Sequence, residues 1–299
     1  MSAHGGAPQG GGNGAGASTG PGPGGRKDWL RIAASMTVTC ALGGALLGGV
    51  YLATERYAEE ARVRGERRAI AEILGLDERA SVRTVEQYLT PERDAVVYRA
   101  AAVDGAAASE LTFALDGSLV RAGSPREAEP DEDLISLGRI FVVTRDHAPA
   151  GFVVEGESRG YKNRIRFFVG VTPAWEIAGV RVVEHEEDPG LGAEIATPWF
   201  QGQYAGRPLA AVPGLDVTRD PMPEDWREVL RGAPRGAGAG GGAPDGRERA
   251  LREREATRPI YAVTGATISS RALTDGVRTT ILHFKRRWDL LAPHLEEGR

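Results

Sequence analysis

Hydroxyl-bearing residues surround a glycine near the end of the chain, in the run TGATIS at residues 264–269. A short apolar stretch, 260–263, precedes this run, and a pattern typical of a helix follows it. Gly265 lets the backbone approach a ligand closely, and the first N–H groups of a helix attract anions. The run therefore predicts a phosphate site at a helix start. For the motif taken alone, a threonine that only caps the helix is the simpler interpretation.

A second run, HEEDPGLGAE at residues 185–194, follows a predicted strand. Its proline fixes a bend and its two glycines flank a leucine, so the backbone of this loop can lie flat against a planar ligand. His185 could tune a redox group or be an ordinary loop residue. The acidic residues 186–188 could form a solvated turn or part of a metal site, but no second cluster of ligands supports a metal.

The composition excludes several classes of function. The net charge of −4 over 299 residues is small and no basic stripe is present, so we expect no nucleic-acid partner. The single cysteine, Cys40, excludes an internal disulfide, a cysteine-ligated iron–sulfur cluster and a thiolate zinc site. Any redox chemistry must therefore come from an added cofactor.

An uncharged segment near the N-terminus predicts a membrane anchor. Residues 32–53 carry no charged side chain, and as a helix they would extend about 33 Å, enough to cross the hydrocarbon layer. We predict a disordered Gly/Pro-rich tail at 1–25, a transmembrane helix at 30–53 and a juxtamembrane helix at 54–80. Basic residues flank the span on both sides, so charge alone leaves its orientation open.

Short strands and one long helix predict an α+β domain at 90–299 with a mixed, mainly antiparallel sheet. The strands are expected near 96–101, 111–115, 140–144, 152–155, 165–171 and 177–184. An amphipathic stretch covers 194–204, and a helix at 270–294 has an apolar face made by Leu273, Val277, Ile281, Phe284 and Trp288. Residues 232–258 are interpreted as a flexible insertion within the domain.

Together the two motifs resemble the FMN-binding domain of the G subunit of the Rnf electron-transport complex and of the C subunit of the sodium-pumping NADH:quinone reductase. The family order of Gly-Tyr, a β-hairpin, His-x-Glu-Thr-Pro-Gly-Leu-Gly and Ser/Thr-Gly-Ala-Thr is matched at 160–161, 165–171, 185–192 and 264–267. The single anchor and the amphipathic helix after it also fit. The sequence departs from the pattern at Tyr261 and Asp188, where the family has Asp and Thr, and at 232–258, which replaces a short hairpin.

The resemblance implies roles for individual residues. Thr267 would be joined to FMN through a phosphoester that a separate flavin transferase makes from FAD, so it would be an attachment point and not a catalyst. No base beside it in sequence would activate its hydroxyl, which agrees with an external enzyme. The family pattern gives as cofactor-binding residues Thr267, Thr264, Gly265, Ala266, Ser269, His185, Glu187, Pro189, Gly190, Leu191 and Gly192, with no catalytic or metal-binding residue.

The same resemblance implies a single-pass flavoprotein of the inner membrane, with its large domain on the extracytoplasmic side. It would relay electrons as one subunit of an ion-translocating complex linked to a ferredoxin/NAD couple, rather than act as a stand-alone enzyme. Its partners would be the membrane, other integral membrane subunits of the complex, and the flavin transferase. Two alternatives stay open: an FMN-binding domain protein of another membrane redox chain, and an anchored domain that has lost its flavin.

Overall fold

The computed structural model describes residues 25–76, 80–103, 106–126, 133–146, 148–232 and 246–296. They fall into two compact units, Met1–Val63 and Arg64–Arg299. The predicted tail at 1–25 lies outside the described residues except for Gly25, and so do residues 77–79 of the predicted juxtamembrane helix.

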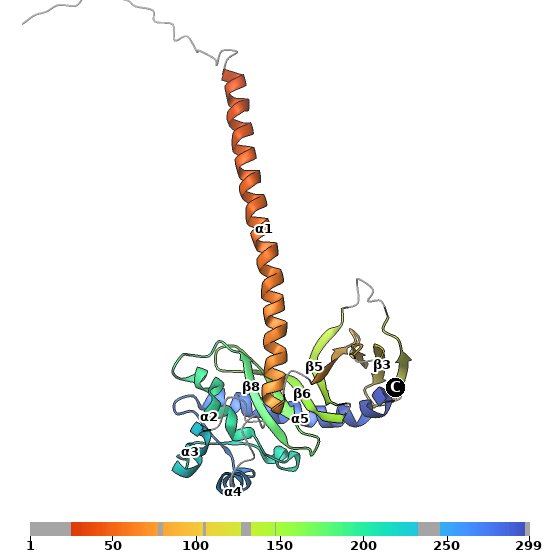
Figure 1. Ribbon diagram of the computed structural model, residues 1–299, viewed down its shortest axis with the longest axis vertical. Coiled ribbons are helices and arrows are strands. Elements are labelled where there is room, and N and C mark those ends of the chain that lie inside the picture. The colour runs from red at the N-terminus through yellow and green to blue at the C-terminus, as the bar shows by residue number, and fades with distance from the viewer. Residues whose placement is uncertain are drawn as a thin grey trace, which may run out of the picture. The chain divides into compact units, whose positions relative to one another are not determined.

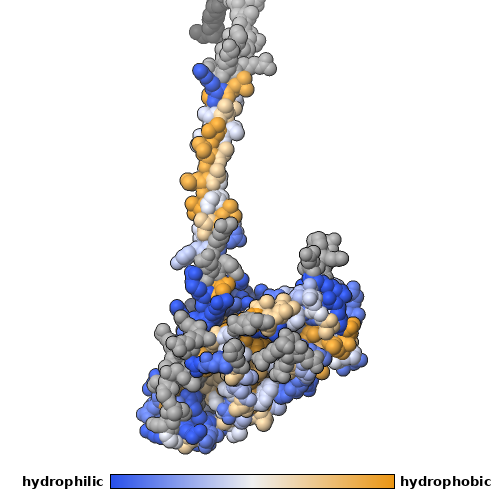
Figure 2. All heavy atoms as spheres, turned by 45° about the vertical axis from the view of Figure 1, so that its right-hand side comes forward, coloured by the Kyte–Doolittle hydropathy of each residue, from blue (hydrophilic) through white to orange (hydrophobic). Residues whose placement is uncertain are grey.

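The first helix, α1 (Gly25–Leu74), contains a stretch that could span a membrane (Figure 1). This stretch, Trp29–Glu55, has 27 residues, and an 18-residue window within it has a mean hydropathy of 1.6 and no buried residue. Figure 2 shows apolar side chains exposed along it. The predicted juxtamembrane helix is the continuation of the same helix, but it ends at Leu74 and not at residue 80. Gly75, with a φ of 64°, ends the helix because glycine adopts this left-handed conformation without strain.

The second unit is built on an eight-stranded sheet in the order β4-β3-β2-β1-β5-β6-β7-β8, in which every neighbouring pair is antiparallel. The strands are β1 (Ser81–Leu89), β2 (Ala95–Ala100), β3 (Ser109–Ala114), β4 (Leu119–Gly123), β5 (Ile135–Arg145), β6 (Ala148–Arg159), β7 (Arg164–Val171) and β8 (Ile177–Glu184). Two further strands, β9 (Val217–Thr218) and β10 (Ile260–Tyr261), form a separate parallel pair. The predicted α+β class is confirmed. The domain begins before the predicted residue 90, because β1 pairs with both β2 and β5.

The long helix α5 (Thr267–Glu296) packs on β6 and β7, as its apolar face predicts. Six short helices lie between β8 and α5 in the described part of the chain: η1 (Gly192–Ala196), α2 (Pro198–Gln201), η2 (Gly202–Tyr204), η3 (Leu209–Gly214), α3 (Glu224–Gly232) and α4 (Gly246–Glu255). The first three of these form the stretch predicted as amphipathic at 194–204. Its apolar side chains, among them Ile195 and Phe200, are buried.

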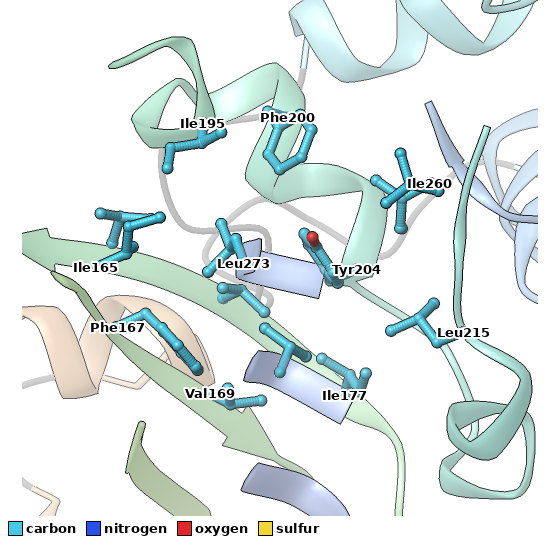
Figure 3. Close-up of a cluster of buried hydrophobic side chains, with 14 of the residues drawn as sticks. Ile165, Phe167, Val169, Ile177, Ile195, Phe200, Tyr204, Leu215, Ile260 and Leu273 are labelled. Atoms are coloured by element: carbon cyan, nitrogen blue, oxygen red, sulfur yellow. The ribbon is translucent and has the colours of Figure 1, made fainter. Parts of the chain in front are cut away.

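The sheet is covered on both faces next to the predicted motifs. On one face, Ile165, Phe167 and Val169 of β7 pack in a cluster with Leu273 and Tyr204 (Figure 3). On the other face, the last turns of α1 contribute the side chains of Ala69, Ile70, Ile73 and Leu74, which pack against Phe141, Val143, Val153 and Phe168. The strands that precede the 185–194 loop and the helix that follows residue 266 are therefore fixed in one core.

The region 232–258 differs in part from the prediction. Residues 233–245 lie outside the described residues, but 246–255 form α4. Leu251 of this helix packs in a small cluster with Trp226, Leu230 and Tyr261. The prediction of a flexible insertion is therefore wrong for the α4 segment. A single leucine beside an alanine among charged residues gives no helical periodicity, so only tertiary packing identifies this helix.

Candidate functional site

A cleft of about 760 Å³ contains the predicted attachment residue, Thr267, on the first turn of α5. Three parts of the chain line it: the start of the short helices after β8, the turn that leads into α3, and the junction between β10 and α5. The lining residues are Gly190, Glu194 and Trp199; Arg219, Asp220, Pro221, Met222, Arg227 and Arg231; and Tyr261, Ala262, Val263, Thr264, Gly265 and Thr267. The volume is in the range of small-molecule sites.

The start of α5 leaves backbone donors available to an anion. Ala266 precedes the first helical residue, and alanine has no side-chain acceptor with which to cap the helix. The Ser270 hydroxyl instead stabilises the preceding turn, because it accepts the N–H of Val263 at 3.0 Å and donates to the Ala266 carbonyl at 2.9 Å. The first N–H groups of a helix have no acceptor within the helix. The residue immediately before α5 is therefore an alanine and not a capping threonine.

Gly265 shapes the same junction. Its φ of 80° lies in the left-handed region that favours glycine, and a Cβ at this position would be 3.1 Å from the Leu191 side chain. The two predicted motifs therefore meet here, with the leucine of one beside the glycine of the other. A larger residue would strain the backbone at this φ and require the exposed Leu191 side chain to shift.

Glu187 joins three segments behind the cleft. Its side chain is buried, with 4% of the residue exposed. Its carboxylate accepts the backbone N–H groups of Tyr161 at 3.2 Å and Lys162 at 3.0 Å, and also the hydroxyl of Ser269 on the first turn of α5. Burial raises the pKa of Glu187, but the hydrogen bonds from Ser269 and the backbone outweigh it and hold the pKa below its usual range. The carboxylate therefore stays ionised and ties the β6–β7 turn to α5.

Glycines make room for this carboxylate. A Cβ on Gly192 would lie 2.8 Å from the Glu187 carboxylate and 2.9 Å from the Ser269 hydroxyl, and a Cβ on Gly160 would also meet the carboxylate. The adjacent acidic residues have partners in the same turn. Asn163 donates to Glu186 at 2.7 Å, and Lys162 pairs with Asp188. The acidic residues 186–188 thus hold the β6–β7 turn through side-chain contacts, and we call the buried Glu187 with its hydrogen bonds the Glu187 clamp.

The predicted cofactor residues separate into two groups in space. Thr264, Gly265, Thr267 and Gly190 line the cleft. The others lie behind or beside it: Glu187, Ser269, Gly192 and Ala266 are buried, Pro189 and Leu191 are exposed, and His185 is half-buried. The His185 ring is turned to its own loop, where Nδ1 accepts the N–H of Glu187 at 3.3 Å. In the described part of the chain, no group of three or more His, Cys, Asp or Glu residues could hold a metal ion.

Several residues that line the cleft belong to no recognisable sequence motif, so the sequence analysis did not predict them. Arg219, Arg227 and Arg231 come from the turn before α3 and from α3 itself, and Trp199 comes from α2. The Arg227 guanidinium is anchored by Glu224 at 2.6 Å and by the Met222 carbonyl at 3.2 Å. Cationic and aromatic side chains next to a helix start can hold a ligand that carries both a phosphate and a planar ring.

Tyr261 is one of the residues that line the cleft. Its N–H donates to the Gln203 side chain at 2.8 Å and its carbonyl accepts from the same amide at 3.1 Å. Its hydroxyl donates to the buried carboxylate of Glu255 at 3.1 Å. The tyrosine is therefore held by η2 on one side and by α4 on the other.

Comparisons with known proteins agree with these motifs. Residues 160–281 match the family model described as "FMN-binding domain". The chain is 28% identical to the G subunit of the proton-translocating ferredoxin:NAD(+) oxidoreductase complex of Clostridium ljungdahlii, over 47% of this chain and 57% of that protein. It is 31% identical to the G subunit of the ion-translocating oxidoreductase complex of Cereibacter sphaeroides, over 56% of this chain and 60% of that protein. The chain thus spans somewhat over half the length of these two relatives.

A solved structure shows a weaker likeness. The crystal structure of Shewanella oneidensis NqrC aligns with 80% of this chain and 98% of its own length, at 17% identity and a TM-score of 0.41.

Proposed function

We propose that FMN is joined through its phosphate to the Thr267 hydroxyl, within residues 160–281, which match the model of the FMN-binding domain. The observation that carries the proposal is the position of Thr267, which lines a ligand-sized cleft at a helix start whose first N–H groups are available. These donors and the positive end of the helix dipole favour a phosphate at this point.

The bond would form by phosphoryl transfer from FAD. Thr267 would supply the oxygen that bonds to the phosphorus of the FMN half, and AMP would leave with the electrons of the broken bond to the bridging oxygen. The hydroxyl proton passes to a base of a flavin transferase. In this domain, the carboxylate of Glu187 is already engaged with Ser269 and two backbone N–H groups, so its role is to position the first turn of α5.

Bound FMN would supply electron transfer in steps of one or two electrons. The cleft residues Gly190, Trp199 and Gly265 would contact it, and the Glu187 clamp would hold the 185–194 loop against the helix start. The relatives are named as G subunits of ion-translocating oxidoreductase complexes, and α1 has the length and composition of a membrane span. We therefore propose a membrane-anchored subunit that relays electrons within an ion-translocating complex linked to a ferredoxin/NAD couple.

Its partners would be the integral membrane subunits of that complex and the transferase, with the flavin domain on the extracytoplasmic side of the inner membrane. Service in another membrane redox chain is the alternative, because the matched domain does not by itself specify the electron donor. Loss of flavin is less compatible with the site, since Thr267 and the glycine of its motif both line an open cleft.

The proposal is tested by measuring whether the full chain carries covalently bound flavin. The chain is produced together with a flavin transferase, denatured, separated on a gel and viewed by flavin fluorescence. We expect a fluorescent band that Thr267→Ala abolishes and that Thr257→Ala retains, because Thr257 is an exposed threonine outside the lining of the cleft and serves as the matched control. A dark band for the unmodified chain, or fluorescence that survives Thr267→Ala, would overturn the proposal.

A further inference from the structure

The cleft that contains Thr267 lies where the parallel pair β9/β10 ends. Thr218 of β9 is opposite Tyr261 of β10, and the Ala262 N–H donates to the Thr218 carbonyl at 2.9 Å. Beyond this pair, β10 continues towards α5, and β9 continues into the turn 219–223 before α3. Arg219, the first residue after β9, therefore lies beside the segment that leads to Thr267, and both residues line the cleft.

Arg219 brings an uncommitted cation to the cleft. The residue is exposed, and within the described part of the chain its guanidinium makes no hydrogen bond or ion pair. The carboxylate next to it in sequence, Asp220, accepts the Thr218 hydroxyl at 2.7 Å instead. A guanidinium has five N–H donors and no acceptor. All the side-chain donors of Arg219 are therefore available to an anion in the cleft.

Two arginines of α3 add to this charge. Arg227 and Arg231 line the cleft and are four residues apart, which places them on one face of the helix. They share a single carboxylate, because Glu224 pairs with Arg227 at 2.6 Å and with Arg231 at 3.7 Å. The Arg231 side chain is 66% exposed, so it can turn to a ligand. We call Arg219, Arg227 and Arg231 the arginine wall.

The attached flavin leaves the arginine wall without an anionic partner of its own. The phosphodiester at Thr267 would carry one negative charge, and the first N–H groups of α5 supply donors for it. The other charged residue of the lining, Glu194, lies in η1 and is acidic, so it does not bind a phosphate. FAD, the flavin donor, carries a second phosphate, and the arginine wall is the part of the lining whose charge suits it.

We propose that the arginine wall, with Arg219 foremost, binds the AMP phosphate of FAD while the flavin is transferred to Thr267; this inference rests on the proposed function. The bond from the Thr267 oxygen to the phosphorus of the FMN half would form as the bond to the bridging oxygen breaks. AMP would leave with the electrons of that bond, and the hydroxyl proton would pass to the transferase. The leaving phosphate gains negative charge, so a guanidinium beside it stabilises the transition state more than bound FAD. Arginines supplied in trans do this in other phosphoryl transfers.

The inference is tested by the rate of flavin attachment to the purified full chain. The chain in detergent micelles is mixed with purified flavin transferase and FAD, and covalent flavin is followed over time by fluorescence in denaturing gels. We expect Arg219→Gln to lower the rate at saturating chain and FAD by at least about tenfold, with the final amount of flavin and the melting temperature unchanged. The matched control, Arg249→Gln, removes an exposed arginine of α4 outside the lining and should change the rate less than about twofold.

Further variants separate this role from others. Arg231→Gln should slow attachment less than Arg219→Gln, because Glu224 already pairs with Arg231, and Arg219→Lys should recover part of the rate because it keeps the charge without the planar fork. An unchanged maximal rate with a higher half-saturating concentration of the chain would mean that Arg219 serves only docking of the transferase, and would overturn the inference. Equal rates for Arg219→Gln and Arg249→Gln would overturn the inference alone, since Thr267 would still carry flavin. A lack of flavin at Thr267 in the unmodified chain would overturn the proposed function and the inference with it.

Discussion

Replacement of Glu187 by glutamine tests whether the buried carboxylate holds the flavin loop to α5. One oxygen of the carboxylate accepts the Lys162 N–H, and the other accepts the Tyr161 N–H and the Ser269 hydroxyl. Glutamine has a single acceptor oxygen, so its amide N–H₂ group must face at least one of these donors. The variant therefore loses at least one charge-assisted bond and leaves a buried donor unpaired.

The size of the effect follows from these bonds. A hydrogen bond to a charged group contributes about 1.5–3 kcal/mol, and an unpaired buried donor costs about 1–3 kcal/mol. We expect the free energy of unfolding to fall by about 2–3 kcal/mol, part of both terms being relieved by rotation of the new amide. For a domain of this size that corresponds to a decrease in Tm of about 4–12 °C.

The matched control is Glu186→Gln at the neighbouring position. Glu186 is exposed and its carboxylate accepts one bond from the Asn163 side chain, so its loss should change stability by less than about 0.5 kcal/mol. The assay is thermal unfolding of the full chain in detergent micelles, followed by circular dichroism at pH 7. Equal melting temperatures for the two variants would refute the role of Glu187.

The pH dependence supplies a second test of the same residue. The folded chain holds the pKa of Glu187 below its usual range, so the ionised carboxylate stabilises the folded state above the unfolded pKa of about 4.3. This contribution is lost as the pH falls through the lower, folded pKa. The stability difference between the unmodified chain and Glu187→Gln should be full at pH 7 and should shrink below about pH 4. A difference that stays constant to pH 3 would contradict an ionised clamp.

Two further substitutions test the packing around the cleft by the same unfolding assay. Gly192→Ala places a methyl group 2.9 Å from the Glu187 Cβ and should lower the free energy of unfolding by about 2 kcal/mol or more. Gly190 has a φ of 73° and no atom within 4 Å of the position that a Cβ would take, so Gly190→Ala should lower it only by the left-handed strain of about 1–2 kcal/mol. A larger loss for Gly190→Ala than for Gly192→Ala would refute the crowding at Gly192. Leu251→Ala should lower the free energy of unfolding by about 2–3 kcal/mol because the side chain is buried. Arg249 is exposed, so Arg249→Ala should lower it by less than about 0.5 kcal/mol. Equal losses for the two variants would mean that α4 does not pack against the domain.

The parts of the fold that the sequence predicts are those with a strong local period. The strands of the region 135–184 alternate or run apolar, and the face of α5 repeats every three or four residues, so their burial on the sheet can be predicted. Strand β1 is missed because it buries only one apolar residue, Val85, together with the polar Gln87. The central position of β1 comes from pairing with β2 and β5, which no local pattern reveals.

The candidate site divides in the same way. Gly190, Gly265 and Thr267 belong to short motifs whose residue types predict the chemistry, and all three line the cleft. The part of the lining that comes from α3 and the turn before it, with Arg219 and Arg231, could not be predicted because these arginines lie in segments without a motif. The contact between Glu187 and Ser269 joins positions far apart in the chain, so the sequence can indicate both residues but not that they bind each other.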